Sequence, residues 1–222
     1  MNNNYYPYKN PSPNIIHSIE NDIITITKTN SVILIEHLIK ILDTHQMLNL
    51  HLLITLFENI IENKNISDKK IIYLIKLLSI NLHTPSLKAR LTRLAILNDR
   101  IELIQWLKKA NLFVLSVALY ASIRANDRQE FIDSLYTILP NTQLKDDIYI
   151  LIDSLIDLIT ETGALDFLHI LLDVKDPDFK EKLRKKLLKR LDYIKGDIKF
   201  LSDESDIYRY QQIISILEER LL

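Results

Sequence analysis

Residues 98–107 read NDRIELIQWL, and residues 126–135 read NDRQEFIDSL. The shared residues of the second stretch follow those of the first by 28 positions throughout. A fixed period of this length is typical of stacked supersecondary units with one helical hairpin per repeat. The two stretches therefore predict an all-α fold that is assembled from helical hairpins.

The Asn-Asp pair of each stretch is expected in the turn of its hairpin, because short polar side chains bond to nearby backbone there. Asp99 and Asp127 are predicted N-caps, since Glu102 and Glu130 follow them at capping-box spacing. Each predicted helix then carries one apolar stripe for burial. The two stripes are Leu103, Ile104 and Leu107, and Phe131, Ile132 and Leu135.

A weaker third copy follows at a longer spacing. Glu161-Thr162-Gly163 precedes Asp166, Phe167, Leu168 and Leu171 in the same order of turn and stripe. On these motifs, residues 84–172 resemble the generic α-helical hairpin repeats of tetratricopeptide, HEAT and ankyrin-like solenoids. The positions that define any one of these families are missing, so no specific family is assigned. The resemblance implies a protein-binding surface.

Composition supports the helical interpretation. The chain has 222 residues with only two glycines, and an all-β or doubly wound fold needs glycine in its turns. It has no cysteine, which excludes disulfides, thiolate catalysis and cysteine-ligated metals. We expect a disordered tail over 1–13, which is polar and contains three prolines, and a single all-helical domain over 14–222. The alternative for the tail is a short motif that docks on a partner.

Periodicity and caps predict a compact antiparallel array of about ten helices with short connections. The count from the individual signals is ten or eleven. The first begins near residue 14, with a strand over 24–29 as the competing interpretation. Cap signals that begin or end helices are Ser67-Asp68, Thr84-Pro85, Gly163, Asp176-Pro177 and Ser205. Besides the repeat helices, the expected ranges are 32–44, 47–63, 69–82, 144–160, 165–174, 177–196 and 206–222.

The segment 177–195 is a basic amphipathic helix. Such a helix suits a nucleic-acid phosphate backbone, an anionic membrane or an acidic partner, and nucleic acid leads among these uses. An ordinary outer helix with solvated lysines is the interpretation that the interleaved Asp178, Glu181 and Asp192 favour over these uses. The candidate binding residues are Lys182, Lys185, Lys186, Lys189 and Arg190, with Arg90 and Arg93 as a second cluster that would extend the footprint.

Asp146, Asp153 and Asp157 share one side of the helix 144–160. A carboxylate stripe can hold Mg²⁺ or Ca²⁺ when a second helix converges on it, and otherwise it is solvated or pairs with the basic helix. Histidine ligands at metal-binding spacing do not occur, although there are six histidines, His17, His37, His45, His51, His83 and His169. We expect no metal and no cofactor.

Glycine occurs only at 163 and 196, so a nucleophile elbow, a P-loop and a dinucleotide fingerprint are absent from the sequence. The leading expectation is a non-enzymatic interaction or adaptor protein that binds another macromolecule through its helical-repeat surface. The alternatives are a nucleic-acid-binding accessory protein and a metal-dependent helical enzyme around Asp146, Asp153 and Asp157. Trp106 is expected to pack in the core.

Charged residues interrupt every long apolar stretch, so no membrane span is expected. The N-terminal residues lack a signal-peptide pattern, and an intracellular, cytoplasmic location is expected. A protein partner is predicted. The helix 206–222 ends in Leu217, Leu221 and Leu222, and this apolar end either caps the array or joins a second chain.

Overall fold

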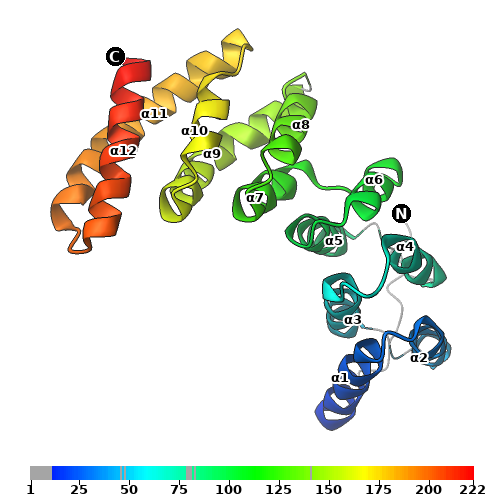
Figure 1. Cartoon of the computed structure of the whole chain (residues 1–222). Coiled ribbons are helices and arrows are strands. Elements are labelled where there is room, and N and C mark those ends of the chain that lie inside the picture. Colours follow the sequence, from blue (N-terminus) through cyan, green and yellow to red (C-terminus); the bar gives the residue numbers. More distant parts are fainter. Residues whose placement is uncertain (1–11, 46, 48, 79–81, 83, 141) are drawn as a thin grey trace. The chain divides into compact units, whose positions relative to one another are not determined.

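The structure is a computed structural model of the chain. It describes residues 12–222 except 46, 48, 79–81, 83 and 141, and it gives no side-chain detail for 142–147. Most of the predicted tail lies outside the described residues, and its last residue, Pro13, already belongs to a helix. Every regular element in the described part of the chain is a helix, which confirms the all-α prediction (Figure 1).

Twelve α-helices and one 3-10 helix cover the described residues. They are α1 Pro13–Lys28, α2 Val32–Thr44, α3 Leu50–Glu62, α4 Asp68–Leu77, α5 Pro85–Leu97, α6 Ile101–Lys109, α7 Leu115–Ala125, α8 Arg128–Ile138, α9 Thr142–Thr162, α10 Leu165–Leu172, α11 Pro177–Asp197, η1 Ile198–Phe200 and α12 Glu204–Leu221. The chain divides into two compact units, Met1–Val114 and Leu115–Leu222. The repeat-like core predicted over 84–172 includes residues of both units.

The first unit consists of three helical hairpins, α1–α2, α3–α4 and α5–α6 (Figure 1). The first helices of the hairpins pack in order, α1 on α3 and α3 on α5, and the second helices do the same, α2 on α4 and α4 on α6. Helix α3 lies at the centre and buries six apolar side chains, among them Phe57 and Leu52. This unit is therefore a two-layer stack of hairpins.

The second unit repeats the arrangement with the hairpins α7–α8, α9–α10 and α11–α12. Helices α7, α9 and α11 pack in order, and α10 packs on α8. Aromatic contacts join neighbouring helices, because Phe131 meets Phe167 edge-on at 5.1 Å between ring centroids and Tyr149 stacks on Phe179 at 5.7 Å. Such pairs add to the free energy gained from burial alone. The predicted helical-hairpin array is confirmed.

In the described part of the chain, five turns contain a residue in the left-handed region. Its φ is 58° at Asn30, 52° at Asp99, 56° at Asn111, 55° at Asn126 and 68° at Gly163. In the last four turns the following residue donates its N–H to the carbonyl five positions earlier, at 2.9 to 3.2 Å, which is the bond that closes a helix in a Schellman motif. Asparagine and aspartate tolerate this conformation best after glycine. They take the place of glycine in this glycine-poor chain, and the predicted cap at Gly163 is confirmed.

The two NDR stretches match in sequence at a spacing of 28, but their turns match at a spacing of 27. Asp99 and Asn126 occupy equivalent left-handed positions, because three residues separate α5 from α6 and only two separate α7 from α8. The predicted N-cap role of Asp99 is therefore wrong. That of Asp127 is confirmed, since its carboxylate accepts the N–H of Glu130 at 3.0 Å.

Arg100 forms a network of buried hydrogen bonds that the sequence did not predict. Its side chain is buried and joins the beginning of α6 to the connection between α3 and α4. The Asp68 carboxylate lies 3.3 Å from the guanidinium and accepts two N–H groups from the first turn of α6, so it supplies the cap that Asp99 does not. The guanidinium also donates to three carbonyls, Nε to Ile61 at 2.8 Å, Nη2 to Asn63 at 2.7 Å and Nη1 to Ile66 at 2.9 Å.

Several helix boundaries agree with the prediction, but α4 ends at Leu77 and not at 82, and α3 begins at Leu50 and not at 47. Helix α2 spans the predicted residues, and Asp176 caps α11 by accepting the N–H of Phe179 at 2.8 Å. The competing strand over 24–29 is wrong, because α1 continues to Lys28. The predicted Ser205 cap is also wrong. Asp203 takes that place and accepts the N–H groups of Ser205 and Asp206, so α12 begins at Glu204.

Candidate functional site

The predicted basic helix is α11. Its apolar stripe is buried in the core of the second unit, as an amphipathic helix requires. Helix α11 therefore has no free apolar face that could insert into an anionic membrane. The buried residues of the stripe are Phe179, Leu183, Leu187, Leu191 and Ile194.

The basic side chains of α11 meet the carboxylate stripe of α9. Lys186 Nζ lies 2.8 Å from Asp153 Oδ2, and Arg190 forms an ion pair with Asp157. Each cation lies four residues from the next on α11, as does each carboxylate on α9, so two turns of the two helices are paired in sequence. The interpretation that the stripe pairs with the basic helix is confirmed for these two carboxylates. The side chain of Asp146 lies outside the described residues.

Further cations of α11 bind within the same unit. Lys182 Nζ lies 4.1 Å from the centroid of the Tyr149 ring, a cation–π contact. Lys185 pairs with Glu181 one turn earlier at 2.7 Å. Toward α12, Lys195 pairs with Glu218 at 2.6 Å and Arg184 donates to the carbonyl of Leu221 at 2.9 Å. Much of the positive charge that the sequence presents is therefore neutralised inside the unit.

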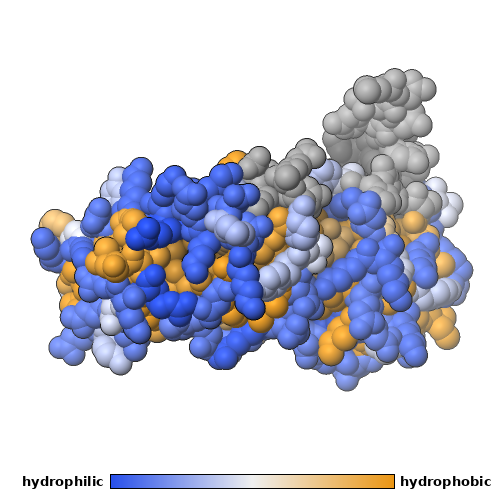
Figure 2. All heavy atoms as spheres, turned by 90° about the horizontal axis from the view of Figure 1, so that it is seen from above, coloured by the Kyte–Doolittle hydropathy of each residue, from blue (hydrophilic) through white to orange (hydrophobic). Residues whose placement is uncertain are grey.

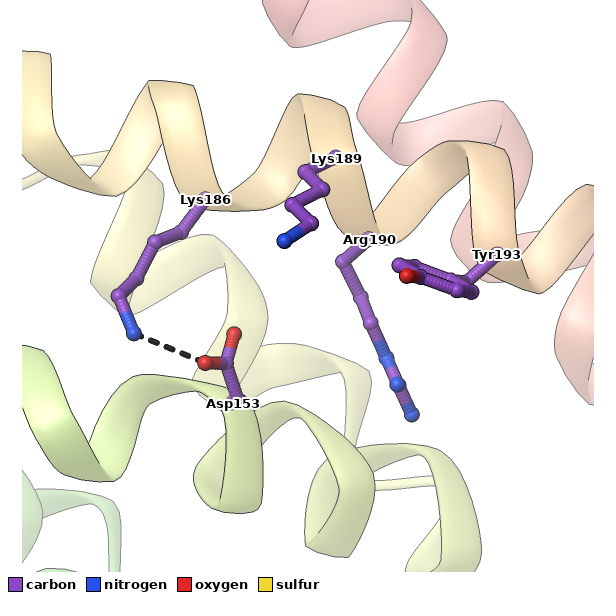
Figure 3. Close-up of a pocket in the computed structure, with 5 residues that line it drawn as sticks. All are labelled: Asp153, Lys186, Lys189, Arg190 and Tyr193. Atoms are coloured by element: carbon purple, nitrogen blue, oxygen red, sulfur yellow. Dashed lines mark hydrogen bonds and ion pairs between the residues drawn. The ribbon is translucent and has the colours of Figure 1, made fainter.

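A groove of about 360 Å³ lies between α9 and α11 (Figure 3). It is lined by Asp153, Lys186, Lys189, Arg190 and Tyr193. Figure 3 shows the last four leaving α11 one after another, with Asp153 on α9 facing Lys186. The groove thus collects three of the cations that the sequence singled out and adds an aromatic side chain.

Lys189 is the exposed cation of this groove. It has no ion-pair partner among the described residues, whereas Lys186 and Arg190 on either side are paired. Tyr193 is 56% exposed, and the Nε of Arg190 is shielded from solvent without an acceptor in the described part of the chain. A carboxylate that entered the groove would find one free ammonium group and donors on both neighbouring side chains.

The second predicted cluster lies in the first unit, on α5. Arg90 forms an ion pair with Glu58 of α3, and burial, together with the nearby charge of Arg93, lowers the pKa of its guanidinium. Arg93 itself is exposed. Arg90 is thus engaged within its own unit, and a footprint that combines α5 with α11 stays a prediction.

Metal chemistry finds no support in the described residues, which contain no cluster of three or more His, Asp or Glu side chains that could hold an ion. Two of the described histidines contact a carboxylate. His51 of α3, for example, pairs with Glu20 of α1. Trp106 is half-buried on α6, and the Lys76 ammonium group lies 5.8 Å from the centroid of its ring.

Sequence reasoning missed Tyr193 as a groove residue. The signal was available, since Tyr193 follows Lys186 by seven residues and Arg190 by three, which places it on the same side of a helix. The apolar end of α12 docks as a cap, because Leu217 and Leu221 are buried and only Leu222 is exposed.

Hydrophilic side chains cover most of the face that Figure 2 shows, with hydrophobic residues visible between them. None of the described helices has the length and apolarity needed to cross a membrane. Comparison of the chain with protein-family models, with curated proteins and with solved structures gave no significant match.

Proposed function

We propose that this protein is a non-enzymatic interaction protein that binds an acidic segment of a partner protein in the groove between α9 and α11. The observation that carries the proposal is the free ammonium group of Lys189, placed between two paired cations and beside the exposed ring of Tyr193. Stacked helical hairpins commonly bind other proteins through their surfaces, which agrees with this use.

The charges of the groove favour a carboxylate over a longer polyanion. Lys186 and Arg190 are already balanced by Asp153 and Asp157, so a ligand gains mainly from Lys189. An incoming carboxylate can share the donors of the existing pairs, and a neighbouring apolar side chain can cover Tyr193. Aromatic and charged groups placed together in this way are typical of binding hot spots.

Titration of a short glutamate-rich peptide tests the proposal. The purified full-length chain should bind the labelled peptide, and Lys189→Glu should weaken binding at least about tenfold, because a charge reversal at the free cation replaces attraction by repulsion. Tyr193→Ala should weaken it by a smaller factor. Lys175→Glu is the matched control, since Lys175 is an exposed lysine that lies outside the groove, and it should change binding less than about twofold.

Equal effects of Lys189→Glu and Lys175→Glu would show that the peptide responds to net charge alone and would refute the groove as the site. Unchanged circular dichroism of both variants is the control for folding.

Nucleic acid is the second candidate, and one observation favours it. Lys182, Lys185 and Lys189 are all exposed and lie on one side of α11. Three phosphate contacts predict a slope of log K against log salt of about −2 to −3. Filter binding of single-stranded and duplex DNA at several salt concentrations should give this slope and a loss of affinity in Lys185→Glu with Lys189→Glu. A flat salt dependence would remove this candidate.

A further inference from the structure

The positive charge of the first unit is concentrated in its last three helices. Residues 64–109 contain ten lysines and arginines but only three aspartates and glutamates, whereas residues 1–63 contain three and six. Two of the ten cations are used inside the unit, because Arg100 is buried among its hydrogen-bond acceptors and Arg90 pairs with Glu58. Helices α4 and α6 carry five of the others, all lysines.

Helix α4 presents two lysines and an aromatic ring on the side opposite its core. At about 100° per residue, Lys69, Tyr73 and Lys76 lie within roughly 60° of one another. All three are exposed, Tyr73 to 45%, and Lys69 has no ion-pair partner in the described part of the chain. The residues that α4 buries on its opposite side are Ile71, Leu74 and Ile75.

Helix α6 packs on α4 and extends this side of the unit (Figure 1). Lys76 Nζ lies 5.8 Å from the centroid of the half-buried Trp106 ring. Lys109 follows Trp106 by three positions, is exposed and has no ion-pair partner among the described residues. The two helices contain only two carboxylates, the exposed Glu102 and the half-buried Asp68, which caps α6. We give the name α4–α6 surface to Lys69, Tyr73, Lys76, Trp106 and Lys109.

The excess of lysines on this surface calls for an anionic partner, and the two rings narrow its chemistry. The face of an aromatic ring is negative, so it disfavours a carboxylate, whereas a nucleobase stacks on it. Lys76 lies close to the outer limit of about 6 Å for a cation–π contact with Trp106, so its ammonium group can turn to a phosphate at little cost. Bases are free to stack on side chains in a single strand, but they are stacked on one another in a duplex.

We infer that the α4–α6 surface binds single-stranded nucleic acid, with phosphates at the three lysines and bases on the rings of Tyr73 and Trp106. The site goes beyond the proposed function, because it lies in the first unit and shares no residue with the groove between α9 and α11. It also differs from the lysines of α11 on which the nucleic-acid candidate depends.

Fluorescence anisotropy of a labelled oligothymidylate of about 15 nucleotides tests the inference with the full-length chain. Three phosphate contacts predict a slope of log K against log salt of about −2 for a single strand. Lys69→Glu with Lys76→Glu should weaken binding at least about tenfold. Lys175→Glu with Lys199→Glu is the control, since it makes the same change in net charge at exposed lysines of the second unit, and it should change binding less than about twofold. Circular dichroism checks the folding of both variants.

Two substitutions of Tyr73 test the role of its ring. Tyr73→Ala should weaken binding about fivefold or more, because it removes a stacking platform. Tyr73→Phe keeps the ring and loses only the hydrogen bond to Glu36, so it should bind as the wild type does. Equal losses in the two variants would refute stacking on this ring.

Trp106 provides a direct signal, because it is the single tryptophan of the chain. Its fluorescence should be quenched as the strand binds, since a base would then stack on its ring. Binding that leaves this fluorescence unchanged would show that the strand lies elsewhere and would overturn the inference.

Three other results would also overturn it. The first is no binding of the strand at about 50 mM salt, and the second is tighter binding of a duplex of equal length. The third is a loss of binding in Lys185→Glu with Lys189→Glu but not in Lys69→Glu with Lys76→Glu, which would assign the strand to α11. The glutamate-rich peptide should bind the Lys69→Glu, Lys76→Glu chain as it binds the wild type, and loss of the peptide in this variant would assign the surface to an acidic protein. The groove depends on Lys189, so the inference and the proposed function can each fail alone.

Discussion

Arg100→Met removes the charged side chain that joins α6 to the connection between α3 and α4. Arg100 is only 6% exposed and donates to three carbonyls as well as to Asp68. Methionine keeps much of the volume but donates nothing. The carbonyls of Ile61 and Ile66 are then left without these donors in a buried setting, and Asp68 loses its cation.

The expected loss in the free energy of unfolding is about 3 to 5 kcal/mol. Breaking one side of a buried pair costs about this amount, and each buried group left without a partner costs about 1 to 3 kcal/mol before relaxation. The separate bonds do not add up in full, because water can reach the partly buried carbonyl of Asn63. Arg100→Lys should recover only part of the loss, since an ammonium group cannot span three carbonyls in the way a guanidinium does.

Arg128→Met is the matched control. Arg128 occupies the same place in the second NDR stretch, but its side chain is 55% exposed and its partner Asp166 is 54% exposed. An exposed pair of this kind contributes about 0 to 1 kcal/mol. One arginine of the sequence repeat should therefore be essential to stability and the other nearly neutral.

Thermal unfolding measured by circular dichroism is a suitable assay, because it reports on the helices of both units. The single tryptophan, Trp106, lies on α6 in the first unit, whereas Arg128 lies on α8 in the second. The Tm should fall by more than about 10 °C in Arg100→Met, given about 4 to 8 °C per kcal/mol in a unit of this size. Equal shifts in the two variants, or a loss below about 1 kcal/mol in Arg100→Met, would refute the reasoning.

Three further outcomes follow from the turns and caps. Asn126→Ala should lower the free energy of unfolding by about 1 kcal/mol, because alanine resists a positive φ. Asn126→Gly should leave that free energy nearly unchanged, because glycine adopts a positive φ without strain. Urea titration measures both. Gly163→Ala should cost about 1 to 2 kcal/mol by the same assay, since its φ is 68° and an added Cβ would lie 3.4 Å from Arg209. Hydrogen bonds from the Ser205 hydroxyl and from backbone N–H groups lower the pKa of Asp203 below its usual 3.8. The Asp203 cap therefore stabilises α12 fully above pH 3.8, and this stabilisation is lost as the pH falls through the lowered pKa. Amide hydrogen exchange at the beginning of α12 should therefore show reduced protection below about pH 4, whereas in Asp203→Ala the protection should be low at every pH.

Much of the fold could be predicted because local signals and burial agree. Asp176 followed by proline gives the beginning of α11, and Gly163 gives the end of α9. A pairing of the basic helix with the carboxylate stripe, as in the Lys186–Asp153 contact, could also be predicted, since both residues lie on stripes of known helical phase. These features depend on residues close in sequence or on helix periodicity, which a single sequence displays.

The misplaced features depend on contacts between distant residues. Asp99 has the sequence of an N-cap, but the cap of α6 comes from Asp68, which lies 34 positions before Glu102. Once that carboxylate occupies the first turn, Asp99 is free to adopt the left-handed conformation that closes α5. Similarly, helical phase shows that Leu34 and Ile41 share a side of α2, but only packing shows that this side is exposed.

The central claim, that this is an interaction protein acting through the α9–α11 groove, is tested most directly by native mass spectrometry of the protein recovered from its own cells. The account predicts a complex with another protein that survives nuclease treatment and is absent when the chain carries Lys189→Glu. Recovery of the wild-type chain without any other protein, or of a partner that the Lys189→Glu chain retains, would contradict it.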